Sequence, residues 1–122
     1  MQTESAFQVG VVRMLRTAGF FVFAVPNGGS RNAREAHNLR LQGVMPGVSD
    51  LVVLLPEGRA VFIELKNPNG KGRQSPAQKD FEARAGLLGH EYLLWASWAD
   101  VNRFINERRE NAQADVQTGG TL

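Results

Sequence analysis

Two apolar stretches stand out in the pattern of hydrophobic and polar residues. Residues 51–55 and 60–65 are rich in Val, Leu and Ile, and Pro and Gly residues lie between them. Apolar runs of this length, bounded by turn residues, are typical of strands, and two in succession predict a buried hairpin. Charged side chains occupy one end of it: Asp50 opens the first strand, and Glu64 and Lys66 close the second. We therefore expect two acids and an ammonium group to gather at one end of a sheet.

The length of the hairpin loop decides whether the two acids can meet. Side chains alternate along a strand, so Glu64 and Lys66 face the same side. Opposed residues of an antiparallel pair also share a side, and a four-residue loop over 56–59 would place Asp50 opposite Leu65. The carboxyl group of Asp50 would then face away from that of Glu64. We predict a loop of three or five residues, or a bulge, that restores the register.

This set of side chains has a chemical interpretation. Two carboxylates on adjacent strands offer hard oxygen ligands, which suit Mg²⁺ or Mn²⁺, and the main-chain carbonyl of Leu65 is a further candidate ligand. A bound divalent ion would lower the pKa of a water for attack on phosphorus and stabilise charge on the phosphate. Lys66 would position that water or hold the phosphate as a point charge. Each charged residue alone is better explained by a solvated strand end, but the three together favour a metal site.

The rest of the chain alternates between helical and extended patterns. Apolar spacing predicts helices over 3–18, 31–42, 76–88 and 98–109, and strands over 20–25 and 91–96. The simplest arrangement of these elements is an α/β fold with a mixed central sheet of about four strands flanked by helices. A chain of 122 residues has room for one such domain. We expect it to occupy residues 1–109, followed by a polar, disordered tail over 110–122.

Glu4 stands at the start of the first predicted helix, on the same stripe as Phe7 and Val11. An acid in the first turn is favoured by the helix dipole, so helix capping explains its presence. The stripe is predicted to face inward, which would also direct this carboxylate towards the sheet. Capping and a role at the predicted metal site both remain open.

Basic residues cluster on either side of the hairpin. The net charge of +2 is too small to indicate a nucleic-acid partner by itself. Four cations and no acid fall within residues 66–79, namely Lys66, Lys71, Arg73 and Lys79. A glycine-rich loop that ends at Ser30 is followed by a second basic cluster, which comprises Arg31, Arg34 and Arg40 and is opposed only by Glu35. A groove that binds a phosphate backbone needs this distribution, although ordinary solvated loops produce it too.

The helix after the second basic stretch begins with a recognisable cap. Ser75 is suited to the N-cap position, Pro76 to the first helical position and Gln78 to the third, which together form a capping box. Capping alone would account for Gln78.

The quoted residues resemble a known nuclease signature. Pro46-Gly47-Val48-Ser49-Asp50, thirteen further residues and then Glu64-Leu65-Lys66 resemble the PD-(D/E)xK pattern. With Ser-Pro-Ala-Gln at 75–78, the chain is similar to the stand-alone virus-type replication-repair nuclease domain, VRR-NUC. Archaeal Holliday junction resolvases are similar in layout. The resemblance covers about residues 3–105.

The resemblance implies a restriction-endonuclease-like core and a metal-dependent, structure-specific DNA endonuclease that cuts four-way junctions as a homodimer. Asp50 and Glu64 would hold Mg²⁺ or Mn²⁺, with Glu4 as a third carboxylate. Gln78 would lie near Lys66 and the DNA. A nuclease of the same fold that cuts flaps or nicked duplex, and a DNA-binding module whose site is idle, are the alternatives.

The sequence also limits the cellular setting. It contains no cysteine, which excludes a disulfide framework and a thiolate zinc site. No apolar run reaches the length of a membrane span, and no N-terminal segment resembles a signal peptide. We expect a cytoplasmic protein without a membrane partner, located in the host cytoplasm if a phage encodes it.

Overall fold

The computed structural model describes residues 3–26, 32–67 and 73–117, with side chains as far as residue 108. Its helices are α1 (Glu4–Thr17), α2 (Ala33–Leu41), α3 (Pro76–Leu87) and α4 (Trp98–Gln117). Its strands are β1 (Phe21–Ala24), β2 (Leu51–Leu55), β3 (Arg59–Leu65) and β4 (Glu91–Trp95), and a 3-10 turn, η1 (Pro56–Gly58), joins β2 to β3. The predicted order of helices and strands is confirmed.

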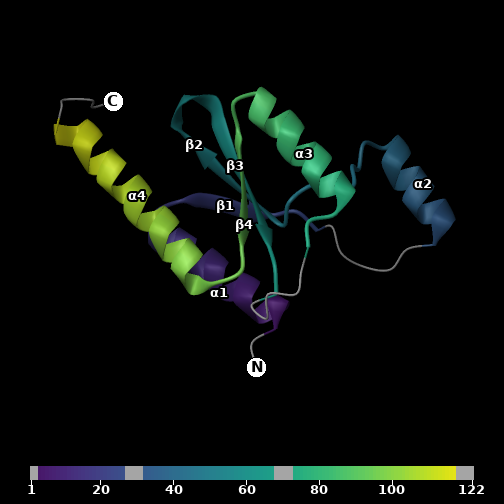
Figure 1. Ribbon diagram of the computed structural model, residues 1–122, viewed down its shortest axis with the longest axis horizontal. Helices are drawn as coiled ribbons and strands as arrows, with labels where there is room; N and C mark the ends of the chain where they lie inside the picture. The colour runs from purple at the N-terminus through teal and green to yellow at the C-terminus, as the bar shows by residue number, and fades with distance from the viewer. Residues whose placement is uncertain (1–2, 27–31, 68–72, 118–122) are drawn as a thin grey trace.

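The strands form one mixed sheet in the order β1-β2-β3-β4. β2 is antiparallel to both β1 and β3, whereas β4 is parallel to β3. The parallel pair requires a crossover, which α3 supplies. α1 and α4 lie on one side of the sheet and α3 on the other, while α2 stands apart at the end of the molecule (Figure 1). The α/β class with a four-stranded mixed sheet is therefore confirmed.

The main core lies between the sheet and the pair α1 and α4. Phe7, Val11 and Leu15 recur at the four-residue spacing of one helix stripe and are fully inaccessible to solvent. They belong to one cluster with the inward side chains of β2 and β3 and with α4. The two helices also pack closely, because a methyl group at Gly10 would overlap the Trp98 ring. The β2–β3 hairpin thus packs against α1 and α4 through this core.

The opposite side of the sheet is only partly covered. α3 packs there through Phe81, whose ring lies 5.0 Å from that of Phe62 on β3 and 5.9 Å from that of Tyr92 on β4. Over β1 and β2 apolar side chains remain open to solvent, with Phe21 66% and Leu54 48% exposed. α3 thus shields the half of this face nearest β4 and leaves the half nearest β1 uncovered.

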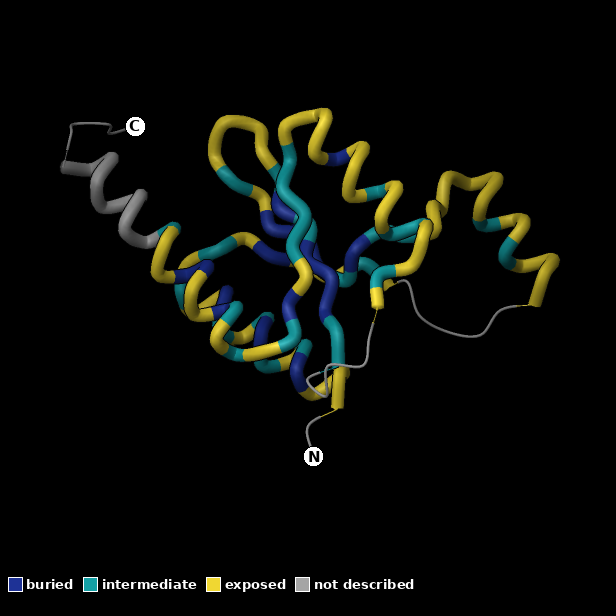
Figure 2. Tube along the Cα trace, in the orientation of Figure 1, coloured by how far each residue is buried: buried dark blue, intermediate teal, exposed yellow. Residues whose placement is uncertain are grey.

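Two elements differ from their predicted form. The apolar spacing of α2 predicts an inward face formed by Ala33, Ala36 and Leu39 or Leu41, but none of its residues is buried, as its trace in Figure 2 shows. α4 continues past 109 to Gln117, so the predicted end of this helix at 109 was wrong, while the division into a domain and a tail stays a prediction. The sequence from 110 to 117 contains neither Gly nor Pro, so nothing in it stops a helix. Although α4 is long, no helix among the described residues is both long and apolar enough to cross a membrane.

Candidate functional site

The pairing of β2 with β3 brings Asp50 and Glu64 to the same side of the sheet. Leu55 pairs with Arg59 across a loop of three residues, and the register continues without a break to Leu51 opposite Ile63. The next pair along this register is Asp50 with Glu64. Opposed residues share a face, so both carboxylates lie on the α3 side of the sheet. The predicted odd-length loop is confirmed, and Arg59 belongs to the strand instead of the loop.

The backbone on both sides fixes the position of Asp50. Its carbonyl oxygen accepts a hydrogen bond of 2.8 Å from the N–H of Val25, which extends the pairing of β1 with β2. Its carboxylate Oδ2 accepts a hydrogen bond of 2.8 Å from the N–H of Leu65. The aspartate therefore ties the ends of three strands together through its backbone and its Oδ2. That the carbonyl of Leu65 serves as a ligand stays a prediction.

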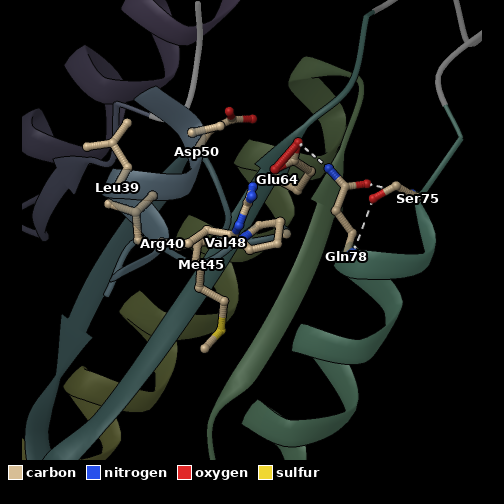
Figure 3. Close-up of a pocket in the computed structure, with 12 residues that line it drawn as sticks. Leu39, Arg40, Met45, Val48, Asp50, Glu64, Ser75 and Gln78 are labelled. Atoms are coloured by element: carbon tan, nitrogen blue, oxygen red, sulfur yellow. Dashed lines mark hydrogen bonds between the residues drawn. The ribbon is translucent and has the colours of Figure 1, made fainter. Parts of the chain in front are cut away.

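Gln78 links Glu64 to Lys66. Its Nε2 donates a hydrogen bond of 3.0 Å to Glu64 Oε2, and its Oε1 accepts one of 3.1 Å from Lys66 Nζ. Figure 3 shows the Gln78 amide reaching from α3 to the Glu64 carboxylate. Lys66 Nζ also donates to the carbonyl of Arg73 at 3.1 Å, so its bonds to described residues use two of its three hydrogens. One amide thus sets the orientation of both charged groups.

The same glutamine completes the predicted helix cap. Its N–H donates to Ser75 Oγ at 3.2 Å, and its Oε1 accepts from the N–H of Ser75 at 2.8 Å. The capping box at the start of α3 is confirmed. Because Oε1 accepts from both Ser75 and Lys66, Gln78 caps the helix and also contacts Lys66, while its place beside the DNA stays a prediction. The end of the helix and the charged cluster are therefore one hydrogen-bonded unit.

Burial and charge repulsion make Glu64 the most perturbed acid of the site. Only 7% of the residue is exposed. The pKa of Glu64 is raised from 4.5 to about 7. Burial is the largest cause and the charge of the neighbouring Asp50 the second, while the charge of Lys66 lowers the pKa. Asp50 acts both through its charge and by accepting a hydrogen bond from the protonated carboxyl. A bound cation would relieve this repulsion.

The donor set fits a small divalent ion. Two carboxylates on one face, each with one oxygen held by an N–H group, offer their other oxygens as hard ligands. Mg²⁺ commonly binds proteins through one or two carboxylates and completes its shell with water and substrate phosphate. Among the described residues no three acidic or histidine side chains lie close enough to hold one ion. Asp50 and Glu64 are thus the pair that could hold it.

Glu4 differs from its predicted orientation. It is exposed at the first position of α1, behind the N-cap Thr3, so the expectation that it faces inward was wrong. The helix begins at this residue, and the buried stripe starts one turn later at Phe7. Its charge still contributes the smallest of the effects that raise the pKa of Glu64. A role as third carboxylate stays a prediction.

A cleft of about 350 Å³ opens beside the two carboxylates. Its lining residues come from α2, from the loop before β2 and from the start of α3, and they are Ala36, Leu39, Arg40, Val44–Val48, Asp50, Glu64, Ser75 and Gln78. In Figure 3 Arg40 and Met45 lie across the cleft from Ser75 and Gln78, with Asp50 and Glu64 between them. The loop therefore forms one wall, and the helix cap forms the other.

Gly47 allows the two walls of the cleft to pack directly against each other. Its φ is +90°, in the left-handed region, and a Cβ there would overlap the carbonyl group of Ala77 and lie 2.9 Å from the N of Gln78. The loop backbone thus packs directly against the first turn of α3. A side chain at this position would push the residue that orients Glu64 and Lys66 away from the hairpin. This requirement explains the glycine of the Pro-Gly-Val-Ser-Asp segment.

The predicted DNA-binding residues are only partly within the described chain. Arg73 and Lys79 are exposed near the cap of α3, beside Lys66 and Gln78. Ser30, Arg31 and Lys71 lie outside the described residues, so their roles stay predictions. The sequence put Arg40 in a basic cluster but did not single it out. Only the fold of the segment between α2 and β2 brings it into the cleft.

Replacing Gly47 by Ala is expected to destabilise the protein more than the same change at Gly43. Both glycines have positive φ, and Gly43 has no neighbouring atom within 4 Å of an added Cβ. Gly43→Ala should therefore cost about 1–2 kcal/mol of unfolding free energy from backbone strain alone. Gly47→Ala should cost about 1–3 kcal/mol more, because the methyl group collides with α3. Urea unfolding measures both, and equal losses would refute the close contact.

The raised pKa of Glu64 predicts a pH-dependent stability in the metal-free protein. Between pH 4.5 and about 7 the folded state binds a proton that the unfolded state has lost, so unfolding free energy falls as pH rises through this window. The full loss is about 3 kcal/mol above pH 7. Glu64→Gln, which mimics the protonated form, should equal the wild type near pH 4.5 and exceed it in stability at pH 8. Parallel stability curves would contradict the shift.

Comparison with solved structures finds chains of the same fold. One, described as "VRR_NUC domain protein", superposes with a TM-score of 0.68 over 90% of this chain and 88% of that one, at 19% sequence identity. A second, described as "VRR_NUC domain", gives a TM-score of 0.60 over 87% of this chain and 97% of that one, at 20% identity. No family model and no curated protein matches the sequence. The chain thus has the fold of these VRR_NUC domain structures.

Proposed function

We propose that this protein is a metal-dependent DNA endonuclease that hydrolyses phosphodiester bonds in branched DNA, above all in four-way junctions. The observation that carries the proposal is the joint placement of Asp50, Glu64 and Lys66. The two carboxylates face each other across the β2–β3 register, and Gln78 links one of them to the ammonium group. This set occurs in the fold of VRR_NUC domain structures, whose names refer to nucleases.

Each side chain has a distinct role in this proposal. Asp50 and Glu64 hold Mg²⁺ or Mn²⁺ through the oxygens that Leu65 and Gln78 leave free. When bound, the ion supplies Lewis-acid activation of a water and neutralises charge on the scissile phosphate. Lys66 places its remaining N–H towards that phosphate or the attacking water. Gln78 lies between the Lys66 ammonium group and the Glu64 carboxylate and hydrogen-bonds to both, which prevents a direct ion pair between them.

The basic residues around the site bind the DNA backbone. Arg73, whose carbonyl accepts from Lys66, and Lys79, in the first turns of α3, are both exposed. We assign Ser30, Arg31 and Lys71 to the same role because their loops flank the hairpin in the sequence. Contacts with phosphate carry affinity without reading the bases, which suits an enzyme that recognises the shape of its substrate.

A homodimer is the second part of the proposal. A four-way junction has two-fold symmetry and needs paired incisions, while each chain carries one candidate site. The open side of the sheet offers a surface for a second copy: β1 is an edge strand, and the rings of Phe21 and Phe23 lie 6.4 Å apart on it. Leu54, which pairs with Phe21, extends the apolar surface. Apolar edges of this kind are unusual on a lone monomer.

Cleavage assays on a four-way junction, a flap, a nicked duplex and a linear duplex test the activity. With Mg²⁺ or Mn²⁺ the protein should cut the junction fastest. Glu64→Gln should abolish cutting and Lys66→Met should slow it by about a hundredfold or more, with junction binding retained. Asp80→Asn, an exposed acid on α3, serves as the matched control and should cut normally. Fastest cutting of flaps or nicks would favour the alternative nuclease, and binding without any cutting would favour an idle DNA-binding module.

A pair of substitutions at the cap of α3 separates structure from catalysis. Ser75→Ala removes the hydroxyl that accepts from the N–H of Gln78 and should cost about 1 kcal/mol of stability. Gln78→Ala removes the contacts with Glu64 and Lys66 as well, and should lower the cleavage rate about 10- to 100-fold. Single-turnover rates and urea unfolding measure the two effects. If Ser75→Ala slows cutting as much as Gln78→Ala, Gln78 acts only as a cap.

The dimer surface predicts a change of oligomeric state. Phe21→Glu places a charge in the centre of the exposed apolar surface and should convert dimers to monomers in light scattering at micromolar concentration. Leu87→Glu, at an 88% exposed position on the end of α3, is the matched control and should leave the dimer intact. A wild-type monomer, or dissociation only by Leu87→Glu, would rule out this interface.

A further inference from the structure

The wall of the cleft that α2 and the following loop form is unusual in its chemistry. Leu39, Val44 and Met45 line it together with Arg40. Val44 is 45% and Met45 48% exposed, although both stand beside two carboxylates. A site for a hydrated ion alone has no use for apolar side chains. The cleft thus combines an apolar wall with an anionic pair, which points to a ligand that is part apolar and part phosphate.

The dimensions of the cleft limit this ligand further. Its volume of about 350 Å³ lies at the small end of the range for small-molecule sites. One nucleoside with its phosphate fits such a space, whereas a stacked base pair within a duplex does not. The opposite wall is polar and rigid, because Ser75 and Gln78 are held by the capping box and by the contact at Gly47.

We propose that the cleft takes an unpaired nucleotide adjacent to the scissile phosphate. This inference rests on the proposed nuclease function and names the part of the substrate that the site selects. The base lies against Leu39, Val44 and Met45, since bases stack on apolar side chains and methionine sulfur makes favourable contacts with aromatic rings. Arg40, whose guanidinium makes no ion pair among the described residues, binds a phosphate of the same strand.

The arrangement explains how a domain without base-specific contacts selects branched DNA. A nucleotide must leave the helical stack to enter the cleft, and this costs least where the base is already unpaired. A branch point interrupts the base stack and weakens the pairs beside it, and a flap supplies nucleotides that are already unpaired, whereas a continuous duplex does neither. Preference for a structure therefore arises at the active site itself, in addition to any selection by a dimer.

A fluorescent base analogue tests the inference directly. A four-way junction carries 2-aminopurine beside its branch point and a linear duplex carries it at the same sequence position, and binding is measured in Ca²⁺, an oxygen-liganded ion of different geometry from Mg²⁺. 2-Aminopurine brightens when it leaves the stack. We expect the protein to raise the fluorescence of the junction probe and to leave that of the duplex probe nearly unchanged.

Two variants that line the cleft connect this signal to its wall. Met45→Ala and Leu39→Ala should remove most of the fluorescence rise and slow junction cleavage in Mg²⁺ by about tenfold, the loss expected when a base stack is weakened. Leu41→Ala is the matched control, because Leu41 is on the same helix, is 73% exposed and does not line the cleft. It should behave as the wild type. Thermal unfolding confirms that all three variants fold.

The outcomes separate this inference from the nuclease proposal. If the wild type cuts the junction but does not raise the fluorescence of the probe, the cleft inference is wrong and the nuclease proposal is supported. The same conclusion follows if the cleft variants match the wild type in both assays. If the wild type cuts nothing yet brightens the probe through Met45 and Leu39, the nuclease proposal fails and the nucleotide site stands. A rise that all variants retain places the unstacked base elsewhere and overturns the inference.

Discussion

The register between β2 and β3 is the constraint on which the candidate site depends. Because side chains alternate, a shift of one residue would move Asp50 to the opposite face of the sheet from Glu64. The three-residue turn prevents this shift at some cost, since Glu57 adopts φ 67°, a conformation that non-glycine residues rarely take, and Gly58 adopts φ 73°. The length of this turn thus decides that two carboxylates at the far end of the hairpin share one face of the sheet.

The hairpin would not make a site without α3. Glu64 is an acid in a largely buried position beside another acid, and such groups persist only where surrounding contacts hold them. Gln78 supplies the contact from the helix side, and Gly47 lets the helix approach closely enough for it. The parallel β3–α3–β4 crossover fixes where that helix starts. Local capping, a glycine contact and sheet topology therefore act together on one carboxylate.

Local rules predicted much of this structure from the sequence. Loop parity, alternation along strands and the Ser75–Gln78 capping box depend on near neighbours, so the register and the start of α3 could be inferred. The inward orientation of Glu4 and the end of α4 at 109 were predicted wrongly, because helix ends depend on where packing begins and on the absence of a stop signal. The position of Arg40 in the cleft could not be predicted from the sequence, since only tertiary structure brings α2 and the following loop to the hairpin.

The central claim is that Asp50 and Glu64 hold one divalent ion between them. Isothermal titration calorimetry with Mn²⁺ at pH 8, above the raised pKa of Glu64, tests it without DNA or turnover. Asp50→Asn and Glu64→Gln should each weaken Mn²⁺ binding by at least about 100-fold, because loss of a residue that only supports a metal ligand already costs about 10- to 100-fold. Asp80→Asn should bind Mn²⁺ as the wild type does. Equal Mn²⁺ affinity in the wild type and in both site variants would contradict it.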